Sequence, residues 1–202
     1  SNASRGLGDV YKRQEWICQL LKNWSVVMSN LVKKLFALVF IGFSLHLVII
    51  YYTPSLMMKF IGRNWEEQNM INNSFARDLP DSEFTEVIRP SADILYGGCA
   101  YDVTYFPLVI ETEVPESYWS ISFFSENTDN FSTINENAHN FGKLKIYLFG
   151  PNSMPTKVND GFIVVSPSNK GLMLMRQFIG NGSKLDKLNE IQNSLDCKLE
   201  GS

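Results

Sequence analysis

A histidine in a polar loop is the residue of this chain whose type best suits catalysis. His139 lies in the sequence NENAHNFG, whose composition is typical of a loop. An imidazole that contacts a serine hydroxyl and a carboxylate can activate the hydroxyl as a nucleophile, so His139 would serve a hydrolase that acts on small esters or envelope lipids. The sequence contains no Gly-x-Ser-x-Gly, Gly-x-Gly-x-x-Gly or phosphate-loop motif, and a plain surface histidine is the simpler interpretation.

Charged and aromatic residues near an Arg-Pro step form a second candidate site. Arg89 precedes a proline, which keeps the arginine backbone extended and aims its guanidinium in one direction. Asp93 and Asp102 are carboxylates that could form a directional ion pair with it. This group either fixes the crossing of two strands or lines a ligand cleft with Tyr96 and Tyr101, whose rings would stack on a carbohydrate or another small ligand.

Cysteines and metal ligands are sparse. Cys99 and Cys197 are the cysteines outside the first 27 residues. They either pair as a disulfide, pack as small buried side chains or provide a reactive thiol. A disulfide would close a loop of about 98 residues and stabilise the fold by about 4 to 5 kcal/mol. The chain has no Cys-x-x-Cys or His-x-His spacing, so we expect neither a metal site nor a cofactor.

Short runs of alternating hydrophobic residues predict the strands that would position these side chains. In the run YWSISFF, Trp119, Ile121 and Phe123 fall on one face, with the period of two that is typical of a strand packed on a core. We read the pair Gly97-Gly98 as a break between segments. The predicted strands cover residues 85–88, 100–106, 108–114, 118–124, 143–149, 161–165 and 172–179. This pattern predicts a mainly β protein, a jelly-roll-like antiparallel β-sandwich.

Two helices complete the predicted body. Residues 65–77 are polar with scattered apolar side chains, and we expect a short helix that packs on the edge of the domain. Residues 184–199 place apolar side chains at spacings of three and four, which is one face of an amphipathic helix. We expect this C-terminal amphipathic helix to close one opening of the sandwich.

An uncharged stretch predicts an N-terminal transmembrane helix. We interpret residues 1–27 as a tag remnant and a non-native leader, with Met28 as the natural start. Leu35 to Tyr52 contains 18 residues without a charge, and a helix of that length, about 27 Å, just crosses a hydrocarbon core. Residues 28–62 would then form a signal-anchor with a juxtamembrane helix, and residues 63–202 an exported β-sandwich domain. A cleaved signal peptide and a buried helix are the alternatives for this stretch.

The predicted body is acidic. From Ile61 onward, 11 Lys and Arg residues stand against 19 Asp and Glu residues, a net charge of −8. Nucleic-acid binding needs basic residues that displace counterions from phosphates, so this class of partner is excluded. The anchor and the few reactive side chains favour an envelope-anchored binding or assembly module, which docks a partner protein or a further copy of the chain, over the hydrolase.

A block of residues in the middle of the chain resembles the bacterial domain-of-unknown-function family 1254 (DUF 1254). The block comprises RPSADILY (89–96), Asp102, FPLVI (106–110), Val114-Pro115 and Tyr118-Trp119. The similarity extends from about Asn69 to Leu199. The chain departs from the family block at Ser91, Ile94 and Gly97, which weakens the case for any activity that depends on these polar positions.

The resemblance implies a jelly-roll-like β-sandwich in a bacterial protein. Some members of the family carry a second domain of the 1214 family, whereas others are short, membrane-anchored proteins that work beside a separate 1214-family protein. This chain is similar to the short type. The resemblance therefore implies a single-pass protein of the bacterial inner membrane, anchored through Leu35 to Tyr52, with its body in the periplasm and a 1214-family protein as partner.

Overall fold

The computed structural model of the protein describes residues 3–79, 91–155, 158, 160–180 and 185–200. The chain divides into two compact units, Ser1–Tyr52 and Thr53–Ser202. Every strand found in these residues belongs to the second unit.

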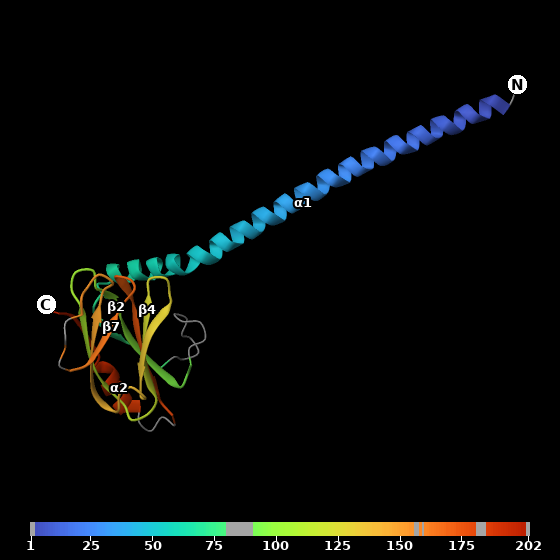
Figure 1. Cartoon of the computed structure of the whole chain (residues 1–202). Helices are drawn as coiled ribbons and strands as arrows, with labels where there is room; N and C mark the ends of the chain where they lie inside the picture. The colour runs from blue at the N-terminus through green and yellow to red at the C-terminus, as the bar shows by residue number, and fades with distance from the viewer. Residues whose placement is uncertain (1–2, 80–90, 156–157, 159, 181–184, 201–202) are drawn as a thin grey trace. The chain divides into compact units, whose positions relative to one another are not determined.

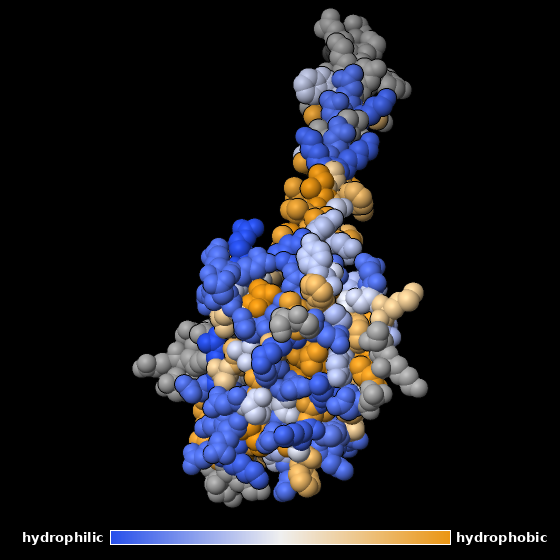
Figure 2. Space-filling model, turned by 90° about the vertical axis from the view of Figure 1, so that its left-hand side faces the viewer, coloured by the Kyte–Doolittle hydropathy of each residue, from blue (hydrophilic) through white to orange (hydrophobic). Residues whose placement is uncertain are grey.

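The first unit is helical. Helix α1 (Ala3–Glu67) supplies its described structure and continues into the second unit. The apolar side chains of the stretch Leu35 to Tyr52 are exposed along the helix, and Figure 2 shows hydrophobic residues gathered in the middle of α1. The part of the chain that the structure describes contains one helix, α1, that is both long enough and apolar enough to span a membrane.

Helix α1 ends at Glu67, so the predicted short helix over residues 65–77 is wrong. Asn69 and Asn72 adopt positive φ angles of 53° and 57°. This left-handed conformation is incompatible with a continuing helix, and asparagine tolerates it better than most residues. The chain then extends into β1 (Ser74–Ala76), which pairs with β2.

Two sheets form the body of the second unit (Figure 1). Sheet A has the strand order β1-β2-β8-β4-β5, and its pairs are antiparallel. Sheet B has the order β7-β6-β3-β9, in which the β6–β7 pair is parallel and departs from the predicted antiparallel arrangement. The other strands are β2 (Ile94–Asp102), β3 (Leu108–Val114), β4 (Trp119–Ser125), β5 (Asn130–Asn135), β6 (Gly142–Phe149), β7 (Phe162–Val165), β8 (Lys170–Phe178) and β9 (Asp196–Leu199).

The hydrophobic core lies between the two sheets. Trp119, Ile121 and Phe123 alternate inward along β4, as predicted, and join a buried cluster with Ile110 of β3 and Leu148 of β6. Apolar residues buried from both faces are the main stabilising contribution to a sandwich of this size. The mainly β prediction is confirmed, whereas the jelly-roll connectivity stays a prediction.

The pair Gly97-Gly98 lies inside β2 and does not break it. A Cβ atom at Gly98 would collide with the backbone oxygen of Met173 on β8 and press on the Phe75 ring. Glycine is therefore needed where three strands approach closely, and the strand runs from Ile94 to Asp102 instead of the predicted 100–106. Strand β5 was not predicted at all, because its sequence NFSTIN is mostly polar.

The C-terminal prediction is correct only in its first half. Helix α2 (Leu185–Asn193) buries Leu188 and Ile191 and contacts β2 and β3, at one end of the sandwich in Figure 1. The chain then leaves the helix and forms β9, which pairs with β3. The predicted strand at 85–88 lies outside the described residues.

Candidate functional site

The residues predicted to line a ligand cleft lie at separate points along β2. Asp93 is exposed just before the strand begins, Tyr96 is half-buried near its start and Asp102 ends it. At about 3.3 Å per residue, Asp93 and Asp102 are about 30 Å apart along the strand. Arg89 lies outside the described residues. The structure therefore does not bring the four described residues together around one cleft.

Tyr101 faces the interior of the sandwich. Its ring is 1% exposed, its hydroxyl donates a hydrogen bond to the Phe124 carbonyl oxygen at 3.0 Å, and it shares another with the Ser166 hydroxyl at 3.0 Å. Burial raises the pKa of Tyr101 to about 12, against a smaller opposing effect of the hydrogen bonds with Ser166 and Ser168. These contacts give Tyr101 a structural role.

Asp102 organises the end of β2. Its carboxylate accepts hydrogen bonds from the Thr104 hydroxyl at 2.5 Å and backbone N–H at 3.0 Å. Lys170 lies 3.4 Å from Asp102 and 2.6 Å from Glu66. Partial burial raises the pKa of Asp102, but the Thr104 hydrogen bonds and the Lys170 charge outweigh it, so the pKa lies below its ordinary value. The carboxylate ties β8 to the turn after β2, and Lys170 links both to Glu66 of α1.

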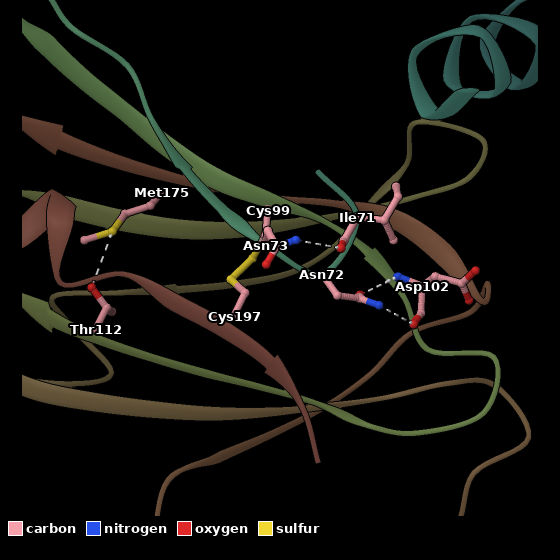
Figure 3. The surroundings of a disulfide bond; sticks show 8 residues. All are labelled: Ile71, Asn72, Asn73, Cys99, Asp102, Thr112, Met175 and Cys197. Carbon is pink, nitrogen blue, oxygen red and sulfur yellow. Dashed lines mark hydrogen bonds between the residues drawn. A yellow bond between two sulfur atoms is a disulfide. The ribbon is translucent and has the colours of Figure 1, made fainter. Parts of the chain in front are cut away.

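A disulfide joins the two sheets near this point (Figure 3). Cys99 of β2 and Cys197 of β9 are bonded with their Cα atoms 6.7 Å apart, and both are buried in the core. Farther along the interior, the Thr112 hydroxyl of β3 donates a weak hydrogen bond to the Met175 sulfur of β8 at 3.8 Å, which also crosses between the sheets. The C-terminal strand is thus covalently fixed to the opposite sheet.

The outer face of sheet B carries a groove of about 590 Å³. Neighbouring strands contribute charged side chains that alternate with core residues, and a turn between β5 and β6 adds His139. We call this the sheet B groove, and it is lined by Glu111, Thr112, Glu113, His139, Lys143, Leu144, Lys145, Asp160, Gly161, Phe162, Ser194 and Asp196. Within the described residues, this groove brings together carboxylates, lysines, an imidazole and a serine hydroxyl.

His139 does not form a catalytic dyad in the sheet B groove. Its ring packs edge-on against Phe162, with centroids 6.1 Å apart, and its Nε2 is buried without a hydrogen-bond partner among the described residues. The nearby Ser194 hydroxyl donates to the Ile191 carbonyl oxygen at 2.7 Å and accepts the Glu113 N–H at 2.9 Å. Ser194 therefore holds the end of α2 against β3.

The groove has a net negative charge. Four carboxylates line it against two lysines. Glu111 pairs with Lys145 at 2.8 Å, and this contact raises the Lys145 pKa. In the described ranges, Glu113 and Asp160 form no ion pair. No group of three His, Cys, Asp or Glu side chains in those ranges could hold a metal ion. The geometry suits a cationic ligand.

Sequence reasoning missed this groove, although a signal was present. The strand LVIETEV carries two glutamates at alternate positions and the strand KLKIYLF two lysines. Antiparallel pairing places Glu111 opposite Lys145 and Glu113 opposite Lys143. The alternation predicts a charged outer face for each strand, but only the pairing shows that the two faces are neighbours.

Comparisons with known proteins agree with this fold. The model of a family described as "Protein of unknown function (DUF1254)" matches residues 71–199. The VPA0106 protein from Vibrio parahaemolyticus is similar in structure, with a TM-score of 0.57 and 14% identity over 74% of this chain and 36% of that chain. A putative uncharacterized protein from Burkholderia cenocepacia gives a TM-score of 0.45 and 10% identity over 66% of this chain and 35% of that chain. No curated protein matches the sequence.

The structural similarity to the Vibrio parahaemolyticus protein shows the β fold alone. The chain spans about a third of the length of the two solved structures, at 36% and 35%.

Proposed function

Because the chain belongs to the DUF1254 family, whose function is unknown, we propose from its site that it is an envelope-anchored binding or assembly module. The sheet B groove docks the partner. The observation that carries the proposal is the charge of the groove. Two of its carboxylates, Glu113 and Asp160, have no ion-pair partner among the described residues. In the same residues, the His139 imidazole has no serine or acid partner. Such a site attracts a basic segment of another protein.

The proposed location is the bacterial inner membrane, with the body in the periplasm. The uncharged stretch from Leu35 to Tyr52 would anchor the chain in the bilayer as a single span. The Cys99–Cys197 disulfide supports an oxidising compartment for the body, because such bonds persist in the periplasm and are rare in the cytosol. The proposed partner is a 1214-family protein, as the family resemblance implies.

Charge reversal in the groove tests this proposal. The chain and a 1214-family protein from the same genome are co-expressed, and the complex is purified from membranes. Glu113→Lys combined with Asp160→Lys should weaken the complex about tenfold, because two rim charges then repel the basic partner. The matched control, Glu116→Lys combined with Asp93→Lys, changes the net charge equally at exposed sites that do not line the groove.

Equal loss of the complex in both double variants would show that overall charge, and not the groove, holds the partner. A complex unaffected by either double variant would remove the sheet B groove as its docking site.

A hydrolase acting on small esters or envelope lipids is the second candidate function. The observation in its favour is that His139 and Ser194 line the same groove. Under the binding proposal, His139→Ala and Ser194→Ala leave the hydrolysis of a panel of p-nitrophenyl esters and phospholipids at the background rate of the wild-type chain. A wild-type rate above that of the heat-denatured protein, abolished by His139→Ala, would replace the binding proposal with the hydrolase.

A further inference from the structure

The end of α1 presents two different faces within the second unit. Every third or fourth residue from Pro54 is half-buried against the body, namely Pro54, Met58, Ile61 and Trp65. Outside this row, Leu56, Met57 and Phe60 are 62%, 58% and 76% exposed. At 100° per residue these three side chains fall within about 100° of one another. Leu56 and Phe60 point away from the half-buried row, and Met57 lies at its flank, next to Ile61. We call them the outer apolar face.

Contacts with the body fix the rotation of this helical segment. The Trp65 ring packs on Phe75 of β1 with centroids 5.7 Å apart. Glu66 pairs with Lys170 of β8 at 2.6 Å, and the Trp65 carbonyl oxygen accepts the Met70 N–H at 2.9 Å. The segment therefore cannot roll to bury the outer apolar face without breaking these contacts.

Two basic residues border the outer apolar face. Lys59 and Arg63 are exposed and lie four residues apart, so they follow one another along the same side of the helix. Helices that lie in the plane of a membrane interface combine an apolar face with lysine and arginine beside it, because the basic groups meet lipid phosphates while the apolar groups enter the acyl boundary.

Chain connectivity places the outer apolar face close to the lipid bilayer. Leu56 follows Tyr52, the last residue of the proposed membrane span, by four positions. Four residues reach at most about 14 Å in any conformation. If Tyr52 lies at the membrane interface, as interfacial tyrosines do, the outer apolar face begins within that distance of the lipid.

We propose that Leu56, Met57 and Phe60 insert into the interface of an anionic phospholipid bilayer, with Lys59 and Arg63 at the phosphate groups. This rests on the membrane anchoring in the proposed function. The body is then held against the bilayer by a second contact besides the span, which restricts its motion and directs its other surfaces to partners in a defined orientation.

Spin labelling of the full chain in vesicles tests this contact. In a Cys18→Ser background, a nitroxide is attached at Phe60→Cys, and in a control protein at Phe141→Cys, which is 65% exposed and lies off the helix. The vesicles contain phosphatidylcholine alone or phosphatidylcholine with about 30% phosphatidylglycerol, whose charge gives the vesicle a negative surface potential. Collision with oxygen, which enters lipid, and with a nickel chelate, which stays in water, reports immersion.

The label at residue 60 should favour oxygen over the nickel chelate in the anionic vesicles, and the label at residue 141 should stay in water. Lys59→Glu combined with Arg63→Glu should lower the immersed fraction at residue 60 several-fold, since each basic residue strengthens binding to an anionic surface about fivefold. The matched control, Lys187→Glu combined with Lys198→Glu at exposed positions that do not line the sheet B groove, should leave the label immersed.

Four results would overturn the inference. A label at residue 60 that stays in water while the protein floats with the vesicles removes the interfacial contact and leaves the span intact. Equal immersion in neutral vesicles removes the role of the basic pair. A label shielded from both reagents shows that a protein surface, a partner or a second copy, covers the face. If the protein does not float with vesicles, the membrane anchoring itself fails, and this inference falls with it.

Discussion

Tyr101 shows how one side chain can fix several elements of the sandwich. Its hydroxyl forms hydrogen bonds with a backbone oxygen of β4 and with a hydroxyl after β7. Gly171 is the residue paired with Tyr101 on the neighbouring strand β8. A Cβ atom at Gly171 would collide with the Tyr101 oxygen, so the glycine is needed for the phenol to sit there. Because the buried Tyr101 hydroxyl has hydrogen-bond partners, the free-energy cost of removing it from water stays low.

The stability of the fold should therefore depend on pH through Tyr101. Burial raises the pKa of Tyr101 in the folded state to about 12, above its ordinary value of about 10, so the contribution to stability is present below pH 10 and is lost as pH rises toward 12. Two pKa units correspond to about 2 to 3 kcal/mol. Urea unfolding at a series of pH values should show this loss in the wild type and a weaker one in Tyr101→Phe.

Tyr105→Phe is the control for this series, because Tyr105 is almost fully exposed. A wild-type pH dependence that Tyr101→Phe leaves unchanged would assign the effect to other groups.

Tyr101 also shows why the four described residues of the predicted cleft do not lie together. Asp93, Tyr96, Tyr101 and Asp102 are close in sequence, and this closeness suggested one site. Residues along a strand alternate between faces, so Tyr101 enters the core while its neighbour Asp102 faces outward. Because the Gly97-Gly98 pair was read as a break, the predicted strand began at residue 100 and not at Ile94. The alternation of inward and outward side chains could therefore not be assigned to Asp93 and Tyr96.

At the scale of elements, the C-terminal segment fits two patterns at once. Leu188, Ile191, Leu195 and Leu199 follow helical spacing, but residues 195, 197 and 199 also follow the alternation of a strand. Pairing with β3 decides in favour of the strand after Asn193. Such pairing joins residues about 85 positions apart in sequence, and no local pattern of residues encodes it.

The disulfide fixes this strand to sheet A, and its loss should destabilise the fold. Cys99→Ala combined with Cys197→Ala should lower the free energy of unfolding by about 2 to 5 kcal/mol, because the unfolded chain regains the entropy of a long open loop. Guanidinium unfolding under oxidising conditions measures this difference. The wild type in excess reductant should approach the double variant, and Cys18→Ala should match the oxidised wild type.

At the scale of the molecule, local patterns of residues were sufficient to predict an apolar N-terminal helix and several of the strands. The uncharged stretch is helical and apolar enough to span a membrane, and strands such as β3 were predicted to the residue. The order of strands in the sheets was not predictable, because it depends on contacts between distant segments. The sheet B groove depends on that order, since Glu111 and Lys145 meet only through the β3–β6 register.

The Cys99–Cys197 bond also decides how tension would pass through the molecule. A pull between the N-terminal helix and the C-terminal end enters at Cys99 and leaves at Cys197 across one covalent link, so the segment between these cysteines, which are 98 positions apart, is bypassed. Among the strands of the described residues, β1 and the first residues of β2 are those that remain in the loaded path before that link. A partner that pulls on the C-terminus would therefore load the pairing of β1 with β2 before the strands between the two cysteines.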